Sequence, residues 1–179
     1  MRVSVMSADA LPLVKRHFAF LSEEYGFALT RSRAVPACAW FASASGTVGV
    51  SYDYLRDAAV DVTLQETPGG DAYLLSDLLA GRGAALPRKR GVRSLDELAA
   101  ELDAAAQALV AHCGEFLRGD AAAFRARHRE AMLVVRCRRL ALGELRRNAP
   151  ERAAALLSAM RGYWTAADRD AFERCTPLL

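Results

Sequence analysis

Two aspartates form the only pair of titratable side chains that the sequence pattern itself brings together. Asp53 and Asp61 fall on the polar sides of two segments in which apolar residues occupy every second position. A pair of carboxylates on neighbouring strands could work as general acid and general base. Such residues are more often simply the solvated face of a half-buried sheet, and we expect that role here.

The cysteines and histidines show no spacing that is diagnostic of a metal site or a catalytic pair. Neither C-x-x-C nor H-x-x-x-H occurs among the four cysteines and three histidines. Cys113 lies on the apolar stripe of a predicted helix, which indicates a small buried side chain and not a nucleophile. We therefore predict reduced thiols, no bound metal, no cofactor and no enzymatic activity.

Positive charge is concentrated in two segments. The predicted helix over 121–147 carries eight arginines against two acids, Glu130 and Glu144, and a predicted exposed loop over 82–93 is also basic. Both segments could neutralise phosphates, although no nucleic-acid-binding motif accompanies them. We expect a solvated face or a protein interface, with nucleic-acid binding as the alternative. The basic candidates for partner binding are Arg88, Lys89, Arg90, Arg125, Arg129, Arg136 and Arg139.

The length of 179 residues and a hydrophobic content of 53% fit one compact domain. A polar joint over 146–150 indicates an α+β part over 1–148 and a helical extension over 149–179, which we expect to belong to the same compact unit. The N-terminal residues lack the apolar stretch of a signal peptide, and no segment approaches the roughly 18 apolar residues that a membrane span needs. These features predict a cytoplasmic protein that does not bind membranes.

The elements change type near residue 67. Helical spacing of Leu11, Val14, Phe18, Leu21 and Tyr25 predicts a helix that starts after Ser7 or Asp9 and stops at Gly26. Alternation then predicts strands over 27–65, joined as a four-stranded antiparallel meander. The aromatic residues Trp40, Tyr52 and Tyr54 could line a pocket, although aromatic side chains on alternating strands usually belong to the core.

The pairing register of the last two strands can also be predicted. Both apolar sets fall on even numbers, so the connection between the strands needs an odd number of residues. A turn over 56–58 would place Asp53 directly opposite Asp61, and this like-charge pair would be unfavourable. We therefore predict the alternative register, with a turn over 55–57.

The C-terminal half carries helix start signals. Ser94 and Glu97 form a capping box before a helix whose apolar face includes Cys113, and Asp120 precedes a helix of roughly 25 residues. Pro150 begins a further helix through Met160, and Thr165 with Asp168 resembles a capping box for a last short one. The segment over 73–79 is typical of a strand end or a short helix. The long helix over 121–147 is compatible with a homodimer.

A resemblance rests on several short segments. These are Phe20–Phe27, Val48–Tyr52, Leu74–Leu79, Ser94–Leu98 and Arg118–Asp120. Over about residues 11–120 the chain resembles a loose group of small bacterial α+β domains, some of which are similar to immunity proteins of polymorphic toxin systems. The resemblance implies a protein partner such as a toxin, and no catalytic residues.

Together these features predict an α+β protein. An N-terminal helix and a C-terminal group of three to four helices would pack on one face of the four-stranded meander. The function that follows is non-enzymatic protein binding, as an immunity-like or accessory factor in bacterial competition or defence. The exposed sheet face, with Asp53 and Asp61, and the long arginine-bearing helix are the predicted binding surfaces.

Overall fold

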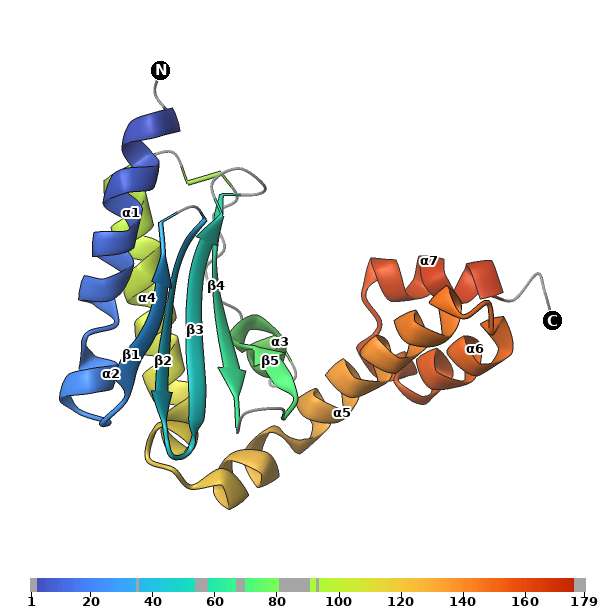
Figure 1. Cartoon of the computed structure of the whole chain (residues 1–179). Coiled ribbons are helices and arrows are strands. Elements are labelled where there is room, and N and C mark those ends of the chain that lie inside the picture. Colours follow the sequence, from blue (N-terminus) through green and yellow to red (C-terminus); the bar gives the residue numbers. More distant parts are fainter. Residues whose placement is uncertain are drawn as a thin grey trace. The chain divides into compact units, whose positions relative to one another are not determined.

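The computed structural model describes residues 3–34, 36–53, 58–66, 70–80, 91–92 and 94–175 (Figure 1). The chain forms two compact units, Met1–Arg127 and His128–Leu179. Helix α5 (Ala121–Arg146) contains this division, whereas the sequence placed a boundary at the polar joint after residue 148. That joint ends α5, and Asn148 has a positive φ of 57° there.

The N-terminal unit is built on an antiparallel sheet in which the strands follow chain order. They are β1 (Ala28–Arg33), β2 (Ala37–Ser43), β3 (Gly46–Asp53), β4 (Ala59–Gln65) and β5 (Ala72–Leu74). The predicted α+β class and antiparallel meander are therefore confirmed, but the sheet has five strands and not four. The fifth strand pairs with β4 over only three residues, which is too short for an alternating pattern to reveal it.

The register between β3 and β4 is the predicted one. Asp53 stands opposite Ala59, and Asp61 stands opposite Ser51, so the two carboxylates are not direct partners. The residues of the connecting turn, 54–57, lie outside those described. The hydrophobic pattern and the avoidance of a like-charge pair together specify this register.

One face of the sheet is buried beneath two helices, α1 (Val3–His17) and α4 (Leu95–Leu117) (Figure 1). Alternate residues of β3 and β4 point to this covered face, and Val48, Tyr52 and Leu64 have no exposed surface. The rings of Phe27 and Phe116 lie between the layers, and their centroids are 6.3 Å apart. Burial of these side chains supplies most of the free energy that holds the two layers together.

The N-terminal helix differs from the prediction at both ends. It begins at Val3, and it is interrupted at residues 18–19 before a short helix, α2 (Phe20–Glu23). At the interruption a backbone hydrogen bond spans three residues, as in a 3₁₀ turn, because the Leu21 N–H donates to the carbonyl of Phe18 at 3.1 Å. The apolar stripe still points inward, because Val14, Phe18 and Leu21 are fully buried.

Helix α4 begins at the predicted capping box, where the backbone N–H of Glu97 donates to Ser94 Oγ at 3.2 Å. Cys113 is fully buried on its apolar face, as expected, and has non-helical backbone angles that mark a kink. The segment over 73–79 contains both predicted elements, the end of β5 and helix α3 (Leu75–Ala80). The unit is thus a sheet with one helical layer.

The C-terminal unit is helical and has its own core. Helices α6 (Pro150–Ala159) and α7 (Ala166–Cys175), with a 3₁₀ turn (Arg161–Tyr163), pack with the second part of α5. Its core is made mainly of small and sulfur-containing residues, including Ala153, Met160 and Cys175. That α6 and α7 pack on the sheet face stays a prediction.

The last helix has the capping box that the sequence indicated. Thr165 and Asp168 bond reciprocally, because the Thr165 N–H donates to Asp168 Oδ2 at 2.7 Å and the Asp168 N–H donates to Thr165 Oγ1 at 3.2 Å. The buried Asp168 carboxylate also accepts from the guanidinium Nε of Arg138 at 2.9 Å. One carboxylate therefore fastens α7 to α5.

Candidate functional site

No helix among the described residues of the N-terminal unit covers the second face of the sheet, which holds the candidate site. We call it the open face (Figure 1). The odd-numbered residues of β3 and β4 point to it, and all of them are partly exposed. The six residues of β1 are exposed as well. Side chains from four strands can therefore meet a ligand or a partner here.

The pairing of the strands arranges the open face in rows. One row across β1 to β4 contains Arg33, Cys38, Ser51 and Asp61. The next row contains Arg31, Trp40, Gly49 and Thr63. Positive charge thus lies on the β1 edge and negative charge lies toward β4, with an aromatic ring and small polar groups between them.

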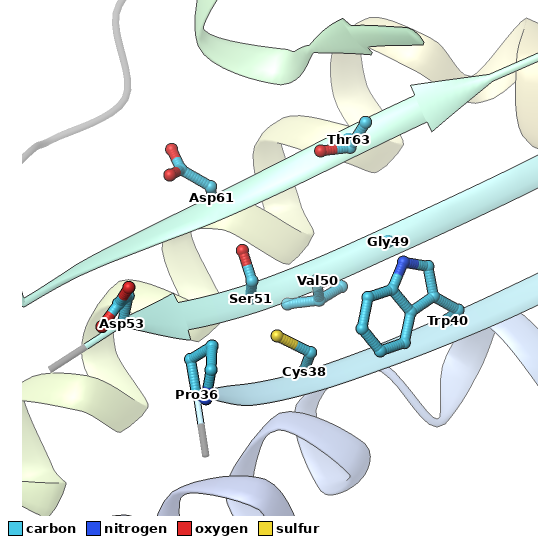
Figure 2. A pocket seen from close by; sticks show the side chains of 9 residues that line it. All are labelled: Pro36, Cys38, Trp40, Gly49, Val50, Ser51, Asp53, Asp61 and Thr63. Atoms are coloured by element: carbon cyan, nitrogen blue, oxygen red, sulfur yellow. The ribbon is translucent and has the colours of Figure 1, made fainter. Parts of the chain in front are cut away.

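A hollow of about 330 Å³ occupies the middle of this face (Figure 2). Nine residues line it: Pro36, Cys38, Trp40, Gly49, Val50, Ser51, Asp53, Asp61 and Thr63. Both predicted aspartates are among them, on neighbouring strands at the rim. The predicted placement of Asp53 and Asp61 on the polar face of the sheet is therefore confirmed.

Trp40 forms one wall of the hollow and is held on two sides. The guanidinium carbon of Arg31 lies 5.1 Å from the centre of the indole ring, within cation–π distance. A side chain at Gly49 would place its Cβ 3.1 Å from the indole Cδ1, so the absence of one gives the ring its space. Of the aromatic residues considered from the sequence, Trp40 lines the hollow, Tyr52 is buried in the core, and Tyr54 lies outside the described residues.

Cys38 lies in the floor of the hollow and is only 6% exposed. Burial raises the pKa of its thiol; the charge of Arg33 opposes this effect, Asp53 adds to it, and Arg31 opposes it. The thiol therefore stays protonated at neutral pH and is a weak nucleophile. Sequence reasoning did not single out Cys38, because the segment Ala37–Ala42 is apolar on both faces and shows no alternation.

The arginines of α5 divide into paired and unpaired sets. In the N-terminal unit, Arg125 bonds to Glu66 at 2.8 Å and Arg127 bonds to Glu115. In the C-terminal unit, Arg138 bonds to Asp168, and Arg139 also has a partner. Arg129 and Arg136 are exposed and form no ion pair with the described residues of their own unit, 128–175. The eight arginines are thus not a uniform basic surface.

The basic loop residues Arg88, Lys89 and Arg90 lie outside the described residues. The four cysteines are free thiols. Within the described ranges there is no group of three or more histidine, cysteine, aspartate and glutamate side chains that could hold a metal ion. Among the same residues, no helix combines the length and the apolar character that crossing a bilayer requires.

Comparison of this chain with protein-family models, with curated proteins and with solved structures found no match. The chemistry of the open face therefore rests on its own geometry. It offers a shallow hollow, charges of both signs, an aromatic wall and a protonated thiol.

Proposed function

We propose that this chain is a non-enzymatic protein-binding factor that recognises its partner through the open face of the sheet. Its place would be that of an immunity-like or accessory protein in bacterial competition or defence, acting on a protein such as a toxin. The observation that carries the proposal is the hollow walled by Trp40, with Arg31 stacked on the ring. Tryptophan and arginine are the residues most enriched among those that dominate binding energy at protein interfaces.

The distribution of charge supports a protein partner. Arg31 and Arg33 lie on the β1 side of the hollow, and Asp53 and Asp61 lie on the other side. A nucleic-acid backbone would meet repulsion from the two aspartates, whereas a protein surface can match both signs at once. Complementary charge of this kind also selects against wrong partners.

The chemistry of the lining residues supports binding in place of catalysis. None of the nine residues around the hollow is a histidine, and burial raises the pKa of the Cys38 thiol. The two aspartates stand opposite Ala59 and Ser51, so they are diagonal neighbours on the sheet and not direct partners. The lining residues therefore lack the histidine base that most often activates a serine or cysteine nucleophile.

The proposal is tested by co-purifying the tagged full chain with the products of the genes that neighbour its own. A partner found in this way should lose affinity by about tenfold or more when Arg31 and Arg33 are both changed to glutamate. Arg169→Glu, an exposed arginine of α7, is the matched control and should leave the affinity unchanged. The proposed site would be overturned if the wild-type chain, the Arg31→Glu/Arg33→Glu variant and the Arg169→Glu variant bound the partner with equal affinity.

A further inference from the structure

A second surface on the C-terminal unit has a different pattern of side chains. Arg129, Leu133, Arg136 and Leu140 follow each other on α5 at steps of four, three and four residues. This spacing places them in one line along the helix, which we call the Arg-Leu stripe. Leu133 is 53% exposed and Leu140 is 45% exposed, so neither leucine belongs to the core of the unit.

The stripe points away from the helices that pack on α5. The residues that follow its leucines in the chain, Val134 and Ala141, are buried in the core formed with α6 and α7. Arg129 and Arg136 form no ion pair with residues 128–175 as described, whereas Arg138 is held by Asp168. The unit therefore presents two exposed leucines two turns apart, flanked by two arginines without an acidic partner in it.

We propose that the Arg-Leu stripe binds an acidic amphipathic helix of a protein partner. Two helices pack along each other when apolar residues recur every seven positions, which is the spacing of the two leucines. The charge of the residues beside these apolar positions determines which partner helix binds. A facing helix with leucines at the same spacing and glutamates beside them would cover both leucines and neutralise both arginines. This inference rests on contacts separate from the open face and stands or falls independently of it.

The charges of α5 favour that occupant over a second copy of the chain. Residues 128–146 contain five arginines (129, 136, 138, 139 and 146) and two glutamates (130 and 144), a net charge of +3. Two such helices side by side would repel each other, whereas an acidic helix is attracted. The leucines favour a helix over nucleic acid, because a phosphate backbone offers them no apolar surface.

The test uses the full chain and a stapled helical peptide of about 20 residues, with leucine at every seventh position and glutamates beside the seam. Fluorescence anisotropy should show saturable binding of this peptide. Leu133→Ala with Leu140→Ala, and separately Arg129→Glu with Arg136→Glu, should each weaken binding about tenfold or more. A peptide with lysine in place of each glutamate should not bind.

Matched controls lie on other faces of the same helix. Leu142 is 52% exposed and Arg146 is exposed, but neither belongs to the stripe, so Leu142→Ala and Arg146→Glu should keep the wild-type affinity. Circular dichroism establishes that each variant retains its helix content. The proposal would be overturned if these two controls lost as much affinity for the peptide as the stripe variants do.

Other occupants are distinguished in parallel. Nucleic acid would be the occupant if the chain bound a duplex or single-stranded oligonucleotide and did not bind the peptide. In that case the arginine variant should lose oligonucleotide binding and the leucine variant should keep it. A dimer in sedimentation velocity that the leucine variant separates would assign it to a second copy. Either result overturns the acidic-helix proposal, and neither bears on the open face.

Discussion

The two faces of the same sheet differ in what their side chains are able to do. On the covered face, Val48, Tyr52 and Leu64 are fully enclosed by α1 and α4, and each contributes burial energy. On the open face, the neighbouring residues Gly49, Ser51 and Thr63 line a hollow with charged groups at its rim. Because side chains alternate along a strand, one segment serves stability with one set of residues and recognition with the other.

The largest expected effect is a difference in stability between substitutions at two adjacent positions of β4, one on each face of the sheet. Val62 is 2% exposed on the covered face, and Thr63 lines the hollow on the open face. Val62→Asp buries a carboxylate without a partner and should cost about 4 kcal/mol or more in the free energy of unfolding. Thr63→Asp adds the same charge where water reaches it, and should cost no more than about 1 kcal/mol.

Urea unfolding followed by circular dichroism measures both values. Failure of Val62→Asp to fold would agree with the expected direction. Equal losses in the two variants would show that the faces are not distinguished by burial, and the comparison would be wrong.

The second effect uses two glycines of β3. At Gly46, where φ is +151°, an added Cβ would lie 2.2 Å from the backbone oxygen of Gln65, so something must shift. Gly46→Ala should cost about 2–4 kcal/mol. At Gly49 the nearest atoms are those of the Trp40 ring, which can move by a few tenths of an ångström. Gly49→Ala should cost less than about 1 kcal/mol and should alter the fluorescence of Trp40.

Thermal and urea unfolding of the two variants, with emission spectra of the folded states, provide the check. A large loss of stability in Gly49→Ala would mean that the open face is packed as tightly as the covered one. A neutral result for Gly46→Ala would mean that the close approach to Gln65 is relieved by the strand.

The smallest effect concerns the alkaline limit of stability. Burial raises the pKa of Tyr52 above its usual 10.0, with further contributions from Glu101 and Glu97. The unfolded state therefore releases this proton first, and the stabilisation is complete below about pH 10 and declines as pH rises beyond it. Tyr52→Phe removes the ionisable group, so its free energy of unfolding should decline less steeply above pH 10.

The reference for this measurement is pH 8, where Tyr52 is protonated in both states. There the variant reports the loss of contacts made by the Tyr52 hydroxyl, which include the 3.3 Å hydrogen bond that it donates to the Val92 carbonyl. Identical slopes for the wild type and Tyr52→Phe above pH 10 would show that the hydroxyl is not desolvated on the covered face.

How much of this could be predicted from the sequence depended on the length and regularity of each segment. The alternation of β3 and β4 fixed both their faces and their register, because one residue of slip would expose every valine and the other candidate register would oppose two aspartates. The helix caps at Ser94 and Asp120 could be predicted from the sequence. Each cap is a hydrogen bond between a side-chain oxygen and the backbone N–H three residues later, so it depends on neighbouring residues alone.

The hollow itself could not be predicted. Cys38 and Trp40 belong to an apolar segment without alternation, so their face is decided only by pairing with Ser51 and Gly49 on β3. The contribution of Arg31 depends on a bulge in the β1–β2 register, which no sequence rule places. The short strand β5 and the interruption of the first helix are likewise set by tertiary contacts.

The most direct test of the open face is the affinity of Trp40→Ala for the co-purified partner, measured by isothermal titration calorimetry beside its free energy of unfolding. The account predicts an affinity at least about tenfold weaker, with stability reduced by no more than about 2 kcal/mol because the ring is only partly buried. Wild-type affinity in a folded Trp40→Ala variant would contradict the claim that this face recognises the partner.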